Sequence, residues 1–179
     1  MSRIRMLLAM LACMVALAGC ASVAVDDYRD ERPVLELSRY FNGVIDGWGV
    51  FQDRSGRVVR RFHVKIDARW DGDTGILDED FTYSDGSKSR RVWTITKIDA
   101  HTYQGRADDV VGTAVGKAYG NALRWTYVLQ LPVDGRIYNV DFDDWMYLVD
   151  DRVMLNRSVM SKFGFRLGEL TLSFSRRAP

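Results

Sequence analysis

The sequence predicts an all-β protein, a single antiparallel β-barrel of about 8–10 strands behind an N-terminal leader. Three observations support this prediction. From Gly47 onward, apolar residues recur at every second position, and no segment of a dozen residues has helical periodicity. Clusters of Gly, Asp, Ser and Pro separate the apolar runs at regular short intervals. Short strands at this spacing are typical of a closed barrel or a sandwich.

Composition limits the class of protein further. The chain has 179 residues, 47% hydrophobic and 27% charged, which suits one globular domain. Its net charge of +1, with both signs interspersed, argues against a nucleic-acid partner. The only two cysteines, Cys13 and Cys20, lie at the N-terminus. The body of the chain therefore contains neither a disulfide nor a thiolate nucleophile.

The leader has the layout of a signal peptide, which we assign to residues 1–19. Arg3 and Arg5 precede an apolar run over 6–18 that is shorter than the roughly 20 residues of a membrane span. The residues Leu-Ala-Gly-Cys that end at Cys20 resemble the bacterial lipobox. The resemblance implies cleavage before Cys20, a diacylglycerol on its sulfur and an added acyl chain such as palmitate. The alternative is an ordinary secretory signal with a chance cysteine.

Ala21 follows the proposed lipidation site, in a position where aspartate would resemble an inner-membrane retention signal. The absence of aspartate at this position favours sorting to the outer membrane, with the protein facing the periplasm. We expect residues 20–40 to be the lipidated N-terminus and a tether, flexible from Ser22 to Pro33 because it is polar and charged. The barrel domain is expected over residues 41–179.

The predicted strands follow the alternation of apolar and polar residues. The clearest is 58–70, where Phe62, Val64 and Ile66 share one face and Arg61 and His63 the other. The other expected strands cover residues 47–53, 76–84, 88–99, 102–108, 123–131, 137–149, 153–160 and 169–176. A short helix is expected at 38–42 or 161–165.

Gly112, Gly116 and Gly120 are spaced by four residues. This spacing occurs in helix-packing motifs, but the segment is too short and too polar for a membrane span. A glycine-kinked strand or a bulged loop is the favoured interpretation.

Two turns allow the strand register near the C-terminus to be predicted. A two-residue loop at 134–135 places Trp125 opposite Asp144. A second two-residue loop at 150–151 places Asp144 opposite Arg157, so the two form a buried ion pair beside Trp125. Alternatively, these groups form the polar anchor of a ligand cavity, or a bulge at Asp143 shifts the register by one residue.

The same register places Trp145, Tyr147, Met154 and Asn156 on the outer face. An exposed patch of this composition is a candidate contact surface for a partner. The alternative is that the N-terminal segment or residues 162–168 cover it.

Several stretches resemble a family of small uncharacterised proteobacterial lipoproteins, known as a domain of unknown function. They are GNALRWTYVLQLPVDGR, FDDWMYLVDD and LNRSVMSKFGFRLGELTLSF, and the likeness extends from Phe41 to Phe174. The resemblance implies a calycin or lipocalin-like barrel without an established activity. Gly47 and Trp48 are similar to the lipocalin G-x-W motif but lack its spacer residue.

Motifs for catalysis or metal binding were not found. There is no G-x-S-x-G sequence, and His63 and His101 lack metal-ligand spacing. The acidic run from Asp71 to Asp80 departs from the EF-hand pattern, so calcium binding is a minor alternative. We expect no catalytic residue, no metal and no cofactor.

The expected function is that of a lipid-anchored, non-enzymatic barrel that binds a fatty acyl or phospholipid chain. The main alternative is a structural or interaction module of the cell envelope that docks a partner protein through Trp145, Tyr147 and Met154. A hydrolase-like enzyme using Asp144 with Asn156 or Arg157 is the least favoured alternative, because an acid paired with arginine is a weak base.

Overall fold

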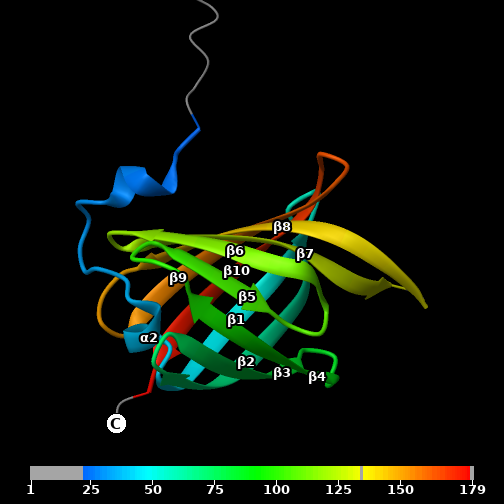
Figure 1. Cartoon of the computed structure of the whole chain (residues 1–179). Coiled ribbons are helices and arrows are strands. Elements are labelled where there is room, and N and C mark those ends of the chain that lie inside the picture. The colour runs from blue at the N-terminus through cyan, green and yellow to red at the C-terminus, as the bar shows by residue number, and fades with distance from the viewer. Residues whose placement is uncertain (1–21, 134, 178–179) are drawn as a thin grey trace, which may run out of the picture.

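The computed structural model describes residues 22–133 and 135–177, and these form one closed antiparallel β-barrel (Figure 1). Each strand pairs with its neighbours in sequence, and the last strand pairs with the first. The strands are β1 (Gly43–Asp53), β2 (Val58–Asp71), β3 (Thr74–Tyr83), β4 (Lys88–Lys97), β5 (Thr102–Arg106), β6 (Val110–Tyr119), β7 (Ala122–Val133), β8 (Arg136–Leu148), β9 (Val153–Lys162) and β10 (Phe165–Arg176). The prediction of an all-β barrel of about 8–10 strands is confirmed.

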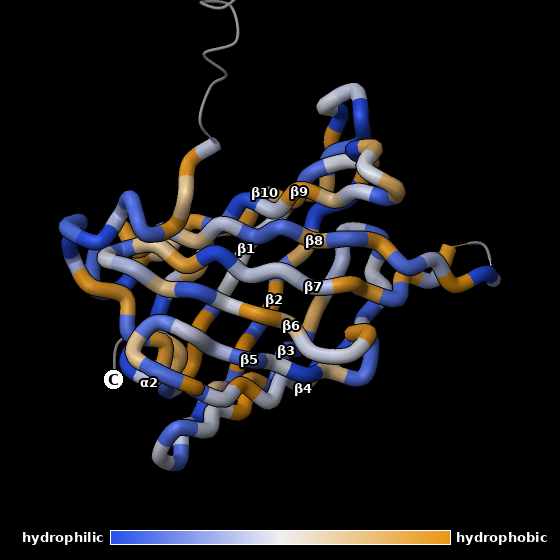
Figure 2. The backbone as a smooth tube through the Cα atoms, turned by 45° about the horizontal axis from the view of Figure 1, so that its top comes forward, coloured by the Kyte–Doolittle hydropathy of each residue, from blue (hydrophilic) through white to orange (hydrophobic). Residues whose placement is uncertain are grey.

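The alternation of side chains along the strands forms the core. In β2, Phe62, Val64 and Ile66 are buried inside the barrel, and Arg61 lies on the outer surface. Hydrophobic and hydrophilic positions follow one another along the strands in Figure 2. Because side chains alternate between the two faces of a strand, this pattern is satisfied when one face is exposed to solvent and the other is buried, as in a closed sheet.

The predicted register of β7 with β8 is confirmed, since Trp125 lies opposite Asp144. The predicted register of β8 with β9 is wrong by one residue, because Asp144 lies opposite Ser158 rather than Arg157. The loop between these strands is longer than the predicted two residues. The Oδ1 atom of Asp150 accepts hydrogen bonds from two successive backbone N–H groups of this loop, at 2.8 Å each. An aspartate side chain that accepts hydrogen bonds from the backbone of its own turn stabilises a loop that is one residue longer than predicted.

Three of the glycines have clear structural roles. Gly112 has φ of +71°, and the pairing of β6 with β7 shifts next to it, as expected for a bulged strand. A Cβ atom on Gly116 would lie 2.0 Å from the Trp125 ring, and one on Gly105 would lie 2.4 Å from it. The absence of both side chains lets the indole lie flat against the inner wall of the sheet.

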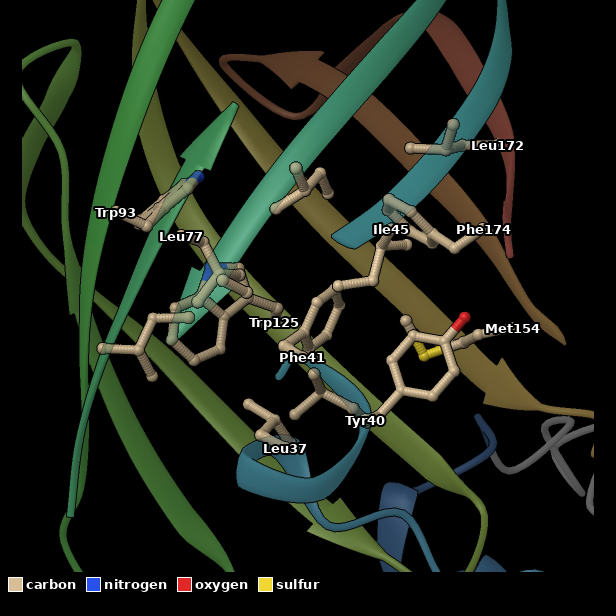
Figure 3. Packing of buried hydrophobic residues seen from close by; sticks show 14 of the residues in the cluster. Leu37, Tyr40, Phe41, Ile45, Leu77, Trp93, Trp125, Met154, Leu172 and Phe174 are labelled. Atoms are coloured by element: carbon tan, nitrogen blue, oxygen red, sulfur yellow. The ribbon is translucent and has the colours of Figure 1, made fainter. Parts of the chain in front are cut away.

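The N-terminal segment closes one end of the barrel. It contains the 3-10 turn η1 (Val25–Tyr28) and the short helix α2 (Leu37–Tyr40). Leu37, Tyr40 and Phe41 are buried in the core (Figure 3), and the indole N–H of Trp70 donates to the Phe41 carbonyl at 2.8 Å. We call this the closed end; the loops after β2, β4, β6 and β8 lie there.

The segment over residues 22–33 was predicted to be a flexible tether. Instead, Val25 is buried, and η1 packs against β6 and β7. The backbone N–H of Leu35 then donates to the Gly120 carbonyl at 2.8 Å. This stretch docks although it is mostly polar, because its few apolar side chains pack against hydrophobic surface of the barrel and both are removed from water. Cys20 and residues 1–19 lie outside the described residues.

The opposite end, which we call the mouth, holds the hairpins after β1, β3, β5, β7 and β9. Both described helices lie away from it, toward the closed end (Figure 1). Inward-facing apolar side chains near the mouth are only partly buried: Phe51, Phe81, Tyr83, Met160 and Leu170. The barrel interior therefore changes from a densely packed closed end to a partly exposed mouth.

Neither of the two described helices is long and apolar enough to span a bilayer.

Candidate functional site

Charged and polar side chains interrupt the apolar interior between the closed end and the mouth. They come from four strands, with Glu79 on β3, Arg91 on β4, Asp144 on β8, and Asn156 and Ser158 on β9. Asp144, Asn156 and Ser158 are 5%, 3% and 0% exposed. Charged groups are rarely buried without a compensating partner, so this cluster marks the candidate site.

Asp144 is incompletely satisfied inside the barrel. The hydroxyl of Tyr127 donates to its Oδ2 atom at 3.3 Å, whereas its buried Oδ1 atom has no hydrogen-bond partner among the described residues. Burial raises the pKa of Asp144 to about 7. The nearby hydroxyl groups of Ser158 and Tyr127, and the positive charge of Arg91, favour the ionised form and limit this rise. The free oxygen is available to a donor group on a bound molecule.

Glu79 and Arg91 form the opposite wall of the cluster. The guanidinium of Arg91 contacts the Asp109 carboxylate at 2.7 Å and lies 3.9 Å from the nearer Glu79 oxygen. Burial raises the pKa of Glu79 to about 7 despite the charge of Arg91. Two carboxyl groups whose pKa values lie near neutrality can donate or accept hydrogen bonds to a polar group that enters the interior.

Aromatic side chains line the interior between this cluster and the mouth. The Phe62 ring contacts Phe51 and Phe81, with centroids 5.3 Å and 5.6 Å apart. The guanidinium of Arg60 lies 3.6 Å from the centroid of Tyr83, and its buried Nε atom has no hydrogen-bond partner among the described residues. Apolar walls with a few convergent polar groups are the usual composition of a small-molecule site.

The predicted ion pair between Asp144 and Arg157 is wrong. Arg157 points outward, its side chain is 62% exposed, and it pairs with Glu169. The one-residue change in register moves every side chain of β9 to the other face of the sheet. Trp125 lies beside Asp144 as predicted and packs edge-on against Trp93, with centroids 5.9 Å apart.

The arginine beside the buried carboxyl groups is Arg91, and neither Arg91 nor Glu79 is among the interior residues expected from the sequence. A signal was present in the alternation. Glu79 continues the buried face of Leu77 in β3, and Arg91 continues the buried face of Trp93 in β4. A charge in phase with an apolar face indicates an inward-pointing polar group.

The predicted outer patch of Trp145, Tyr147, Met154 and Asn156 is only half correct. Met154 and Asn156 are buried inside the barrel, for the same reason of register. Trp145 and Tyr147 lie on the outer face, and the Tyr28 ring of η1 packs on them, with centroids 6.1 Å and 5.4 Å away. The N-terminal segment thus covers this face, which was the alternative left open by the sequence.

A separate apolar groove lies on the outside of the barrel, over β1, β2, β9 and β10. Its volume is 360 Å³. Outward side chains along it include Trp48, Val50 and Leu155, and Trp48 is more than half exposed. Over the described ranges, no group of three His, Cys, Asp or Glu side chains is placed to hold a metal ion.

These features define a closed ten-stranded antiparallel barrel of the calycin-like type, with a charged cluster inside and an aromatic mouth. Residues 14–176 match the model of a family described as "Protein of unknown function (DUF3833)", and the chain belongs to this family. Comparison with curated proteins finds no match.

Solved structures resemble the fold. The S-type phycobiliprotein lyase CPES from Guillardia theta aligns with a TM-score of 0.56 at 5% identity, over 77% of this chain and 89% of the lyase. A de novo designed fluorescence-activating β-barrel aligns with a TM-score of 0.45 at 11% identity, over 80% of this chain and 99% of the design. At the identity of the lyase, the likeness concerns the fold alone.

Proposed function

We propose that this protein is a lipid-anchored lipoprotein of the outer membrane, facing the periplasm, whose barrel binds an amphipathic lipid. The acyl chain of the lipid would lie among the aromatic side chains near the mouth, and its polar head would reach the interior cluster. The observation that supports this proposal best is the buried Oδ1 atom of Asp144, which has no hydrogen-bond partner among the described residues. Such a group in a native interior needs an explanation, and a bound donor supplies one.

The energetic argument concerns the whole cluster. Burying a carboxyl group costs several kcal/mol unless it is paired and hydrogen-bonded, and the barrel contains two with raised pKa values. Apolar side chains of similar size would give a more stable core. A fold that keeps Glu79, Arg91 and Asp144 in place of such a core is consistent with selection for binding.

Membrane attachment rests on Cys20 and the apolar run before it. Three acyl chains on one cysteine would hold the protein on a bilayer, since each buried CH₂ contributes about 0.8 kcal/mol. Mass spectrometry of the N-terminal peptide from membrane extracts tests this part of the proposal. A peptide starting at residue 20 with diacylglyceryl and acyl groups is expected; an unmodified Cys20 would refute it.

Native mass spectrometry of the protein released from membranes tests lipid binding. We expect a co-purifying lipid in the wild type and its loss in Asp144→Asn, because the amide removes the carboxylate while preserving the shape. Asp143→Asn is the matched control, since Asp143 is adjacent but pairs with Arg124 outside the barrel, at 2.7 Å. A fluorescent fatty acid, cis-parinaric acid, provides the same comparison in solution. Absence of any bound lipid and of probe binding in the wild type would refute the proposal.

The second candidate is an interaction module of the cell envelope that binds no ligand. The outer groove beside Trp48 and Leu155 favours it, since an apolar groove on the outside of a soluble barrel is typical of a contact surface. Photo-crosslinking from position 155 in intact cells tests this candidate. One reproducible protein adduct would support it, and adducts to lipid alone would count against it.

A further inference from the structure

The hairpin between β9 and β10 carries large apolar side chains that no described part of the fold covers. Phe163 is 85% exposed, Phe165 is 71% exposed and Leu167 is 44% exposed. Phe163 has φ of +52° and Gly164 has φ of +79°, so the two form the tight turn at the tip. An exposed phenylalanine side chain contributes no hydrophobic stabilisation to the fold, whereas its transfer from water to an apolar medium is favourable.

Cations surround this tip. The ammonium of Lys162 lies 5.0 Å from the Phe163 ring centroid and 5.7 Å from that of Tyr138. Arg166 is exposed on the same hairpin. Glu169, the acid on these two strands, is largely buried and pairs with both Arg157 and Arg166, which leaves the hairpin with an excess of positive charge. The surface of the hairpin is therefore apolar and basic, which is the composition of segments that bind anionic lipid surfaces.

The β7–β8 hairpin extends this surface at the mouth. Ile137 is 68% exposed and Tyr138 is 38% exposed, and Arg136 beside them is also exposed. The Lys162 ammonium donates to the Asn139 carbonyl at 2.8 Å and so links the two hairpins. Aromatic and basic side chains on neighbouring tips match the interfacial zone of a bilayer.

The start of the described chain and the β9–β10 hairpin lie at opposite ends of the barrel but project in the same direction. In Figures 1 and 2 both point toward the top of the view, the first near the closed end and the second at the mouth. Cys20 precedes the first described residue, Ser22, by only two positions. Two residues reach about 7 Å when fully extended. An acylated Cys20 would therefore keep the barrel close to the bilayer, with the side from which the hairpin projects facing the lipid.

We propose that the β9–β10 hairpin inserts its tip, Phe163 to Phe165, into the surface of a bilayer containing anionic phospholipid. This second contact would fix the orientation of the barrel and hold its mouth against the lipid. The inference deepens the proposed function, which supplies the lipid anchor and the ligand, but the hairpin's own affinity for lipid does not depend on either. The lipid anchor would raise the effective concentration of the tip at the membrane, so the two contacts together would bind more tightly than either alone.

Co-sedimentation of the chain over residues 21–179 with lipid vesicles tests the inference. This chain contains the entire closed barrel and the N-terminal segment that closes its end, and it lacks Cys20, so acylation cannot contribute. We expect it to bind vesicles of phosphatidylglycerol and phosphatidylethanolamine, to bind phosphatidylcholine vesicles less, and to be released by salt. Phe163→Ser with Phe165→Ser should weaken binding at least about tenfold.

Val149→Ser is the matched control, because Val149 is 54% exposed in a loop at the closed end. Val149→Ser should bind within about twofold of the wild type. Like the double phenylalanine variant it replaces exposed apolar surface, but Val149 lies outside the proposed membrane-binding surface. Thermal melts of all variants should agree, because the tip side chains are largely exposed.

Wild-type chain that does not bind anionic vesicles, or a double phenylalanine variant that binds like the wild type, would overturn the inference. Crosslinks from residue 163 to a protein, without vesicle binding, would overturn it in favour of a protein partner. If the vesicles bind but cis-parinaric acid does not, the hairpin inference stands and the proposed ligand function fails.

Discussion

Asp144→Asn should make the stability of the protein less dependent on pH. Burial raises the pKa of Asp144 to about 7, against 3.8 for an ordinary aspartate. A tenfold change in proton affinity corresponds to about 1.36 kcal/mol. Ionising Asp144 inside the folded barrel therefore costs up to about 4 kcal/mol more than ionising it in the unfolded chain.

The sign of the effect follows from proton binding. Between about pH 4 and pH 7 the folded chain holds a proton on Asp144 that the unfolded chain has released. The free energy of unfolding must therefore fall as the pH rises through this window, and must level off above about pH 7. Glu79, whose pKa is also about 7, contributes in the same direction.

Urea unfolding followed by tryptophan fluorescence at pH 5, 6, 7 and 8 measures this dependence. We expect the fall in the free energy of unfolding to be about 2–4 kcal/mol smaller in Asp144→Asn than in the wild type, because asparagine does not ionise. Asp143→Asn is the control and should keep most of the wild-type fall, since it leaves Asp144 buried and removes an exposed pair with Arg124 and only a minor contribution to the raised pKa of Asp144.

A result in which Asp144→Asn and the wild type lose stability equally between pH 5 and pH 8 would refute the reasoning. It would mean that Asp144 reaches water or a partner and carries no desolvation penalty. The candidate site would then lose its main physical support.

The remaining predictions concern other positions in the barrel. Arg91→Met should cost about 3–5 kcal/mol of stability because it leaves buried carboxyl groups without a cation, whereas Arg157→Met at the outer surface should cost less than about 1 kcal/mol; chemical denaturation of both variants measures this difference. Gly116→Ala should cost about 1–3 kcal/mol, since the new methyl group meets the Trp125 ring, and an unchanged melting temperature would contradict the packing described. The hydrogen bond from Arg177 and the contact with His63 lower the pKa of Asp46 to about 2, so its contribution of about 1–2 kcal/mol is present above about pH 4 and lost toward pH 2; Asp46→Asn should be less stable than the wild type at pH 6 but equally stable at pH 2.

The fold class could be predicted because the alternation of apolar and polar residues is local. In β2 the period of two is nearly unbroken from Phe62 to Ala68, and it already tells which face is dry. The β7–β8 register was also predictable, since a short turn with a glycine at positive φ connects the strands and the pairing continues along their length.

The interior cluster could not be predicted in full. The loop between β8 and β9 depends on one aspartate accepting two backbone hydrogen bonds, and its extra residue exchanges the two faces of β9. Composition does not distinguish a two-residue loop from a longer one here. The sequence therefore predicts Arg157 on the inner face, whereas in the barrel it lies on the outer face.

Residue patterns along the chain thus determine the strands, the inner and outer faces of strands such as β2, and the lipobox-like pattern before Cys20, because each depends on neighbours a few positions apart. Only the closed sheet decides that the charges of Glu79 and Arg91 lie close enough to act on Asp144, and that Tyr28 packs on Trp145. These contacts join strands far apart in the sequence, and a one-residue change in any connecting loop would break them. The physical reason is that a barrel has no free edge, so the register of each strand constrains which side chains share its interior.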